Sequence, residues 1–129
     1  MFKYLKFSLA PLTVLVSIFF ALLGGNYIWY FLLSFSSFII IGDMIFGEDT
    51  SINNYKYPFF LNLLLYLNLP LLIILIFVMI NVIDHQSIFS FIGYCLTIGL
   101  MLGAFAVNVG HELTHRKNNK FDMFVGNWL

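Results

Sequence analysis

PFFLNLLLYLNLPLLIILIFVMINVI, residues 58–83, is an apolar run without a single Asp, Glu, Lys or Arg side chain. A helix needs about 20 mostly apolar residues to cross the hydrocarbon core of a bilayer. This run is long enough to cross with some tilt. Pro70 lies inside it, and membrane helices tolerate such a proline, often with a kink. The run therefore predicts a transmembrane helix.

Three further apolar runs predict three more transmembrane helices. Their expected boundaries are about 7–25, 27–46 and 88–109. The first run follows two lysines and could also be a secretory signal peptide, but three more spans follow it and no A-x-A cleavage site is evident. The sequence thus predicts an all-α fold, a bundle of four transmembrane helices that forms a single transmembrane domain over residues 1–129.

The composition also points to a protein surrounded by lipid. Hydrophobic residues make up 61% of the chain and charged residues 9%, whereas a soluble domain carries about 25% charged residues. The formal net charge is zero, so the chain lacks the basic field of a nucleic-acid-binding protein. Cys95 is the only cysteine and cannot form an intramolecular disulfide.

The distribution of cations predicts which side of the membrane each segment faces. If the N-terminus is cytoplasmic, four spans place the N-terminal segment, the 47–56 polar loop and the C-terminal segment on the cytoplasmic side. Cytoplasmic segments of membrane proteins are enriched in Lys and Arg. The outer turns, near Asn26 and Asp84, carry no Lys or Arg, and the inner segments carry all six: Lys3, Lys6, Lys56, Arg116, Lys117 and Lys120. A bacterial inner or plasma membrane is expected.

Two histidines at the end of the fourth run form a candidate metal site. His111 and His115 are four residues apart, so on a continuous helix they lie on one face about one turn apart. Imidazole suits zinc, iron and copper. Glu112 is rotated by about 100° from His111. It is therefore placed to orient a ligand or handle protons rather than to be a ligand itself.

The pair has two interpretations as a metal site. H-E-x-x-H is the signature of zinc metallopeptidases, in which two histidines bind zinc and the glutamate is the base. Such a site needs a third protein ligand, and Asp122 is the only candidate after His115. The second interpretation is a non-haem di-iron centre, and it depends on the surrounding residues.

Two segments carry a resemblance to a known family. NVGHELTHRK, residues 108–117, resembles the first histidine box of the membrane-bound alkane monooxygenases, which belong to the fatty acid desaturase-like superfamily. GDMIFGEDTS, residues 42–51, resembles the acidic loop that those enzymes carry between their second and third spans. The resemblance covers most of the chain from Asp43 onward.

The resemblance implies a function and a site. His111 and His115 would be ligands of a non-haem di-iron centre, and Glu112 would lie beside them without binding iron. The reaction would be hydroxylation of alkanes or related lipid-like chains with O2. Electrons would come from a soluble, rubredoxin-like donor at the cytoplasmic face, where Lys117 and Lys120 could attract it. His85 lies on the opposite side of the predicted topology and is excluded from the site.

The sequence departs from the family pattern after the first box. The family uses several histidine boxes, and this chain has two histidines on the predicted inner side. Residues 121–129 resemble the start of another apolar segment, so we expect an N-terminal fragment of a longer enzyme that is inactive alone. A third interpretation is a non-enzymatic membrane scaffold or small transporter. Polar groups within its spans would then mark a pathway. The candidates are Asn62, Asn68, Tyr94 and Asn108, although most of them are expected to form helix–helix hydrogen bonds instead.

Overall fold

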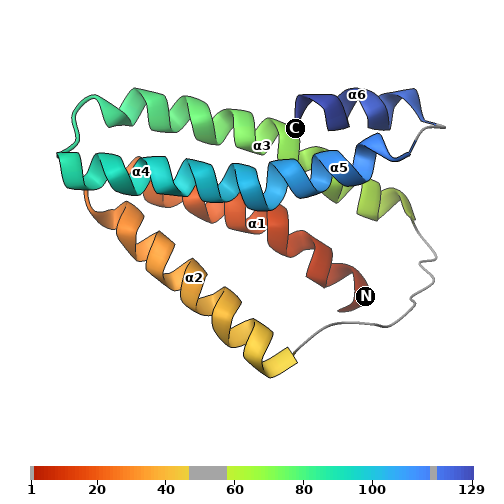
Figure 1. Ribbon diagram of the computed structural model, residues 1–129, viewed down its shortest axis with the longest axis horizontal. Coiled ribbons are helices and arrows are strands. Elements are labelled where there is room, and N and C mark those ends of the chain that lie inside the picture. The colour runs from red at the N-terminus through yellow and green to blue at the C-terminus, as the bar shows by residue number, and fades with distance from the viewer. Residues whose placement is uncertain (1, 47–57, 117–118) are drawn as a thin grey trace.

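The computed structural model describes residues 2–46, 58–116 and 119–129, and these residues form helices joined by short turns, with no strand among them (Figure 1). The all-α prediction is confirmed. The elements are α1 Phe2–Leu23, α2 Tyr27–Phe46, α3 Pro58–Ile83, α4 Ile88–Met101, the π-helical segment η1 Leu102–Val107, α5 Asn108–Thr114 and α6 Lys120–Trp128.

Three of these helical stretches are long and apolar enough to cross a membrane: Tyr27–Ile45, Phe59–Ile83 and Ile88–Thr114. The apolar part of α1, Phe7–Leu23, is shorter than that. The helix of the fourth predicted span, 88–109, continues through the histidine pair, because α4, η1 and α5 form one continuous helical stretch to Thr114. Gly110 lies within this stretch and packs closely against α6.

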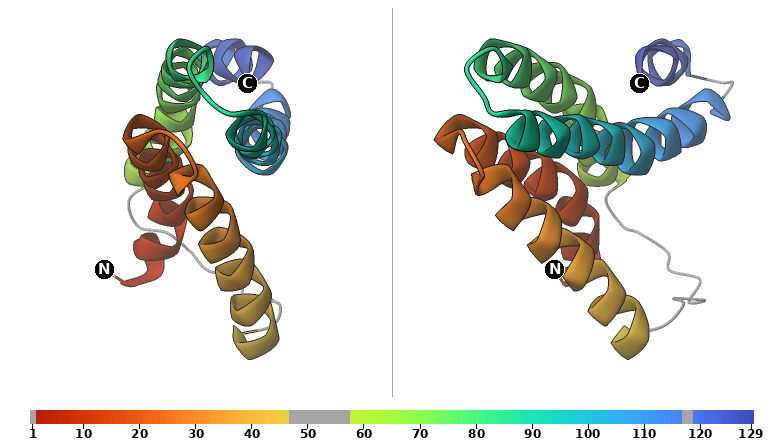
Figure 2. Two further views of the ribbon diagram at one scale, coloured as in Figure 1. Left: turned by 90° about the vertical axis from the view of Figure 1, so that its left-hand side faces the viewer. Right: turned by 60° about the vertical axis from the view of Figure 1, so that its left-hand side comes forward.

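The core lies where α1, α3 and α4 meet. α1 packs along α3, α4 runs beside α3 after a tight turn, and α2 starts close to both α1 and α4 (Figure 1). The side chains at the centre of this core are at most 1% exposed: Val14, Ala21, Ile28, Leu75, Met79, Tyr94 and Met101. α2 then leans away from the other helices toward its C-terminal end (Figure 2).

Apolar grooves follow from this inclination of α2. One groove, of about 340 Å³, lies between α1 and α2, and another, of about 310 Å³, lies between α2 and α4. The first is lined by Leu9, Leu12, Thr13, Val16, Phe20, Phe31, Ser34, Phe35 and Phe38. Both grooves are open, so hydrocarbon in the bilayer can reach them.

Polar contacts fasten the α1–α2 turn to the α3–α4 turn. Gly24 and Gly25 have φ of 77° and 55°, a left-handed conformation that glycine adopts without a steric penalty. The backbone N–H of Gly25 donates to Gln86 Oε1 at 2.6 Å, and Ser90 Oγ donates to Asn26 Oδ1 at 2.8 Å. Both turns therefore lie at one end of the bundle, and the N-terminal end of α1 and the C-terminal end of α5 lie at the other (Figure 1).

Gln86→Ala is expected to lower the free energy of unfolding by about 0.5–1.5 kcal/mol, because it removes the hydrogen bond that joins the two turns. The measurement is reversible unfolding of the detergent-solubilised protein. His85→Ala, at the exposed neighbouring position, is the control and should leave stability unchanged. Equal stability of the Gln86→Ala variant and the parent would contradict this role of the turn contact.

A short helix follows the fourth span. α6 begins at Lys120, and Asn119 caps it: its Oδ1 accepts hydrogen bonds from the N–H groups of Phe121 and Asp122 at 3.0 and 3.5 Å. α6 folds back along α5 and also touches α3 (Figure 1). A Cβ atom on Gly126 would lie 2.9 Å from the carbonyl oxygen of Gly110. The close approach of the two helices thus depends on glycine.

Candidate metal site

The rings of His111 and His115 converge at the C-terminal end of α5. Their Nε2 atoms are 3.0 Å apart, and the ring centroids are 4.4 Å apart with an interplanar angle of 85°. Both residues are exposed. His115 is the C-cap of α5, with φ −72° and ψ −15°. The four-residue spacing therefore does bring the two imidazoles together on one side of a helix.

This geometry suits a pair of metal ligands. Metal–imidazole bonds are about 2.0–2.1 Å long, so a cation bound by both Nε2 atoms 3.0 Å apart would see an angle of about 95° between them. Two imidazoles this close can bind one cation together, and imidazole suits zinc, copper, iron and nickel alike. The negative end of the helix dipole lies at the same place and favours a cation. Without a metal, one N–H···N hydrogen bond explains the same distance.

The pair faces away from the helices that pack on α5. Val109, Gly110 and Leu113 are the buried residues of α5, and they contact α3 and α6. Successive residues of a helix are rotated by about 100°, which places His111 and His115 roughly opposite this packed face. Among the described residues, no cluster of three or more His, Cys, Asp or Glu side chains is placed to hold a metal ion.

Glu112 is held in an ion pair and does not join the histidines. Its Oε1 accepts hydrogen bonds from Nε and Nη2 of Arg116 at 3.2 and 3.0 Å. The side chain of Glu112 is 58% exposed. A role as a catalytic base would require this ion pair to open.

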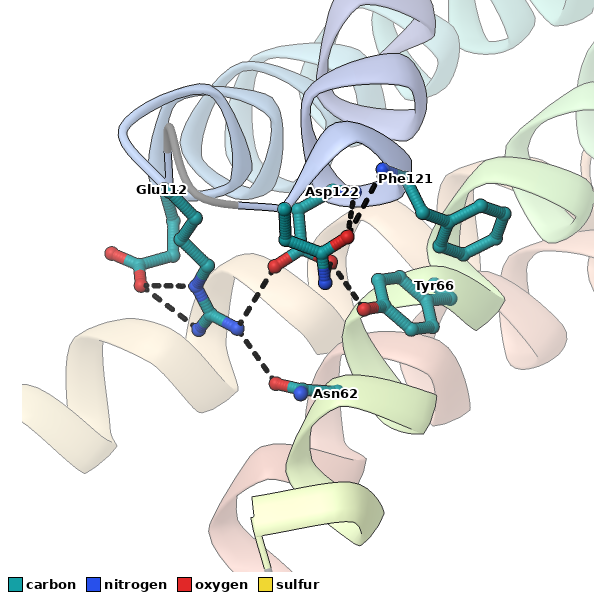
Figure 3. Close-up of polar contacts among 7 residues, drawn as sticks. Asn62, Tyr66, Glu112, Phe121 and Asp122 are labelled. Carbon is teal, nitrogen blue, oxygen red and sulfur yellow. Dashed lines mark hydrogen bonds and ion pairs between the residues drawn. The ribbon is translucent and has the colours of Figure 1, made fainter.

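Asp122, the candidate third ligand of the zinc interpretation, is engaged elsewhere (Figure 3). Its side chain is 3% exposed. Its Oδ1 accepts hydrogen bonds from the hydroxyl of Tyr66 and from Nδ2 of Asn119, the latter at 3.0 Å. Its Oδ2 lies 3.7 Å from Nη1 of Arg116. The structure therefore places the buried carboxylate of Asp122 in a polar cluster between α3 and α6.

Arg116 is the centre of this polar cluster. Besides the contacts with Glu112 and Asp122, its Nη1 donates to Asn62 Oδ1 at 2.7 Å. One guanidinium thus links α5, α3 and α6. The sequence did not predict the cluster, because its members come from segments far apart along the chain. The one signal in the sequence was Asp122, an acidic residue beyond the last predicted span. The structure buries its side chain almost completely.

The four polar positions predicted within the spans form two kinds of hydrogen bond. Some bonds join separate elements, and others stay within one helical stretch. The hydroxyl of Tyr94 on α4 donates to the Ala21 carbonyl on α1 at 3.1 Å, so the predicted helix–helix hydrogen bond exists there. Asn62 on α3 instead accepts from Arg116, which lies just beyond the end of α5. The prediction is wrong for the other two, because Asn68 and Asn108 donate to carbonyls of their own helical stretch. The amide of a mid-helix Asn reaches the carbonyl four residues earlier, which satisfies it locally.

Part of the family-like acidic loop lies outside the described residues. Gly42 to Phe46 belong to α2, with Asp43 exposed near its end. Glu48 and Asp49, the other two acidic residues of that segment, lie outside the described ranges, as does Lys117.

No family model, curated protein or solved structure matches the chain.

Proposed function

We propose that this chain is part of a membrane-bound, non-haem di-iron monooxygenase that hydroxylates alkanes or related lipid-like chains with O2. The observation that carries the proposal is the convergence of His111 and His115, whose Nε2 atoms lie 3.0 Å apart at the end of an apolar helix. The resemblance of NVGHELTHRK to a family histidine box adds to it. The two imidazoles would be two of the iron ligands.

The residues of the site fit such a metal in part. The two imidazoles point away from α3 and α6, so further ligands can approach them from the open side. Those ligands would come from residues beyond the described ones, since no third His, Cys, Asp or Glu among these joins the pair. Iron would supply the activation of O2 that an unactivated C–H bond requires and that side-chain acids and bases lack.

Other parts of the chain suit a hydrocarbon substrate and a soluble electron donor. The open groove between α1 and α2 is apolar, with Phe20, Phe31 and Phe35 among its lining residues, and its volume is near the lower limit of about 300 Å³ for ligand sites. A straight hydrocarbon chain could enter such a groove from the bilayer. The exposed Lys120, at the start of α6, would help to attract an acidic, rubredoxin-like donor.

The test is to express the intact gene product in iron-replete cells and measure bound iron and oxygenation together. We expect iron in the purified protein, and O2-dependent conversion of a straight-chain alkane to its terminal alcohol when membranes are supplied with a reductant and a rubredoxin-like donor. Purified protein that is free of iron, in membranes that leave the alkane unchanged, would contradict the proposal.

Glu112→Gln separates this proposal from the zinc metallopeptidase alternative. We expect the variant to retain its iron. Its free energy of unfolding should fall by about 0.3–0.5 kcal/mol, because the substitution removes an exposed ion pair between residues one helical turn apart. Iron content and thermal unfolding are the measurements, with Asp43→Asn as a control for loss of an exposed carboxylate. Zinc-dependent peptide cleavage that is lost in Glu112→Gln while the metal stays bound would favour the peptidase instead.

A further inference from the structure

His115 lies at the C-terminal end of its helix, where few backbone hydrogen bonds hold the chain. α5 ends at Thr114, and His115 is the cap residue. The last backbone hydrogen bonds run from the N–H of His115 to the His111 carbonyl at 3.3 Å, and from the N–H of Arg116 to the Leu113 carbonyl at 3.2 Å. Final helical turns fray because few bonds hold them. If this turn opened, His115 would separate from His111.

Arg116 has contacts that oppose such fraying. Its bonds to Glu112, four residues earlier, span the final turn itself, in the orientation with the acid N-terminal that stabilises a helix best. Its Nη1 reaches Asn62 on α3 at 2.7 Å and Asp122 on α6 at 3.7 Å. The first residue after the His pair is therefore tied to three separate elements.

Asp122, the ion-pair partner of Arg116 on α6, is itself held in place by other side chains. The Asp122 side chain is 3% exposed, and it is fixed by Tyr66 from α3 and by the cap residue Asn119. A buried carboxylate without a cation is costly, so Asp122 and the arginine depend on each other.

We propose that Arg116 is a positioning residue: it clamps the last turn of α5 between α3 and α6 and so holds His115 within reach of His111. The inference rests on the proposed metal-binding function for its purpose, but the clamp itself concerns the geometry of the metal-free pair. Arg116 touches neither imidazole in the hydrogen-bonded contacts of the described residues. Its action on the pair is therefore mechanical.

The test uses the whole chain in detergent micelles and two measurements. The first is NMR of 15N-labelled histidine in the metal-free protein, which detects the scalar coupling between the two Nε2 atoms across their hydrogen bond. The second is the affinity for Co²⁺ alone. We expect Arg116→Gln to abolish the coupling and to weaken Co²⁺ binding by about 10-fold or more, the usual effect of losing a residue that orients a metal ligand.

Two further variants and a control make the test decisive. Asp122→Asn, which removes the charge that anchors the guanidinium, should weaken the coupling and the affinity in the same direction. Arg116→Lys, which keeps the charge but not the planar fork, should fall between the parent and Arg116→Gln. Asn127→Ala, at an exposed position of α6, should behave as the parent. If Arg116→Gln fails to fold, Asp122→Asn and Arg116→Lys provide the answer.

The results separate this inference from the proposed function. Parent-like coupling and Co²⁺ affinity in folded Arg116→Gln, or in Asp122→Asn where the first does not fold, would overturn the clamp and leave the metal site standing. Coupling that is lost in Arg116→Gln, in a parent protein that binds no Co²⁺, would support the clamp and count against the metal site.

Discussion

Under the proposed function, replacement of both His111 and His115 with alanine is expected to remove iron from the intact protein and abolish oxygenation. The two Nε2 atoms converge at 3.0 Å, and within the described residues no other His, Cys, Asp or Glu cluster can replace them. Loss of a residue that only orients a ligand costs about 10–100-fold in metal affinity. Removal of both donors should cost more. Iron analysis and alkane oxidation by membranes are the measurements.

His85→Ala is the matched control for this pair. It removes the third histidine of the chain, which lies in the turn between α3 and α4 at the other end of the bundle (Figure 1). We expect His85→Ala to retain the iron and the oxygenation of the parent. Full iron content in the double histidine variant would show that the metal is held elsewhere, and the proposed function would lose its site.

Gly126→Val is expected to produce the largest loss of stability among single substitutions in the described residues around the site. A Cβ atom at Gly126 would lie 2.9 Å from the Gly110 carbonyl oxygen and 3.0 Å from side-chain carbons of Leu113 and Thr114. Backbone cannot move aside as a flexible side chain does, so α6 must separate from α5. Overpacking of this kind costs about 1–3 kcal/mol. Thermal unfolding in detergent measures it.

Gly99→Val is the control for the glycine substitution. Gly99 lies on α4, and a Cβ atom there would meet nothing within 4 Å, so the same change of residue should cost much less. Gly126→Val should also weaken Co²⁺ binding by the His pair, because it displaces the helix that carries Asp122. Equal unfolding temperatures for the two variants would contradict the close packing of α5 on α6.

Three of the four predicted spans match helices long and apolar enough to cross a membrane, because the hydropathy signal is local. The run of residues 58–83 needs no tertiary contact to be recognised, and its boundaries agree with α3. The close packing of Gly110 against Gly126 could not be predicted in this way, because the two glycines meet only when α6 folds back along α5.

The candidate site was also predictable from the sequence only in part. The spacing of His111 and His115 was sufficient to predict that the rings meet, because four residues are one helical turn. The role of Arg116 was not predictable, because Asn62 and Asp122 approach it only after α3 and α6 have packed. Similarly, the π-helical turn Leu102–Val107, which sets the rotation of α5 relative to α4, has no recognisable pattern in the sequence.

α2 is anchored near its start and inclined away from the other helices toward its C-terminal end. Near its start, the Trp29 ring stacks on Phe89 with centroids 4.8 Å apart, and its indole N–H donates to the Phe89 carbonyl at 3.1 Å. Toward its end, nearly all side chains are exposed. The width of both apolar grooves therefore depends on the angle at which α2 leaves its anchored start.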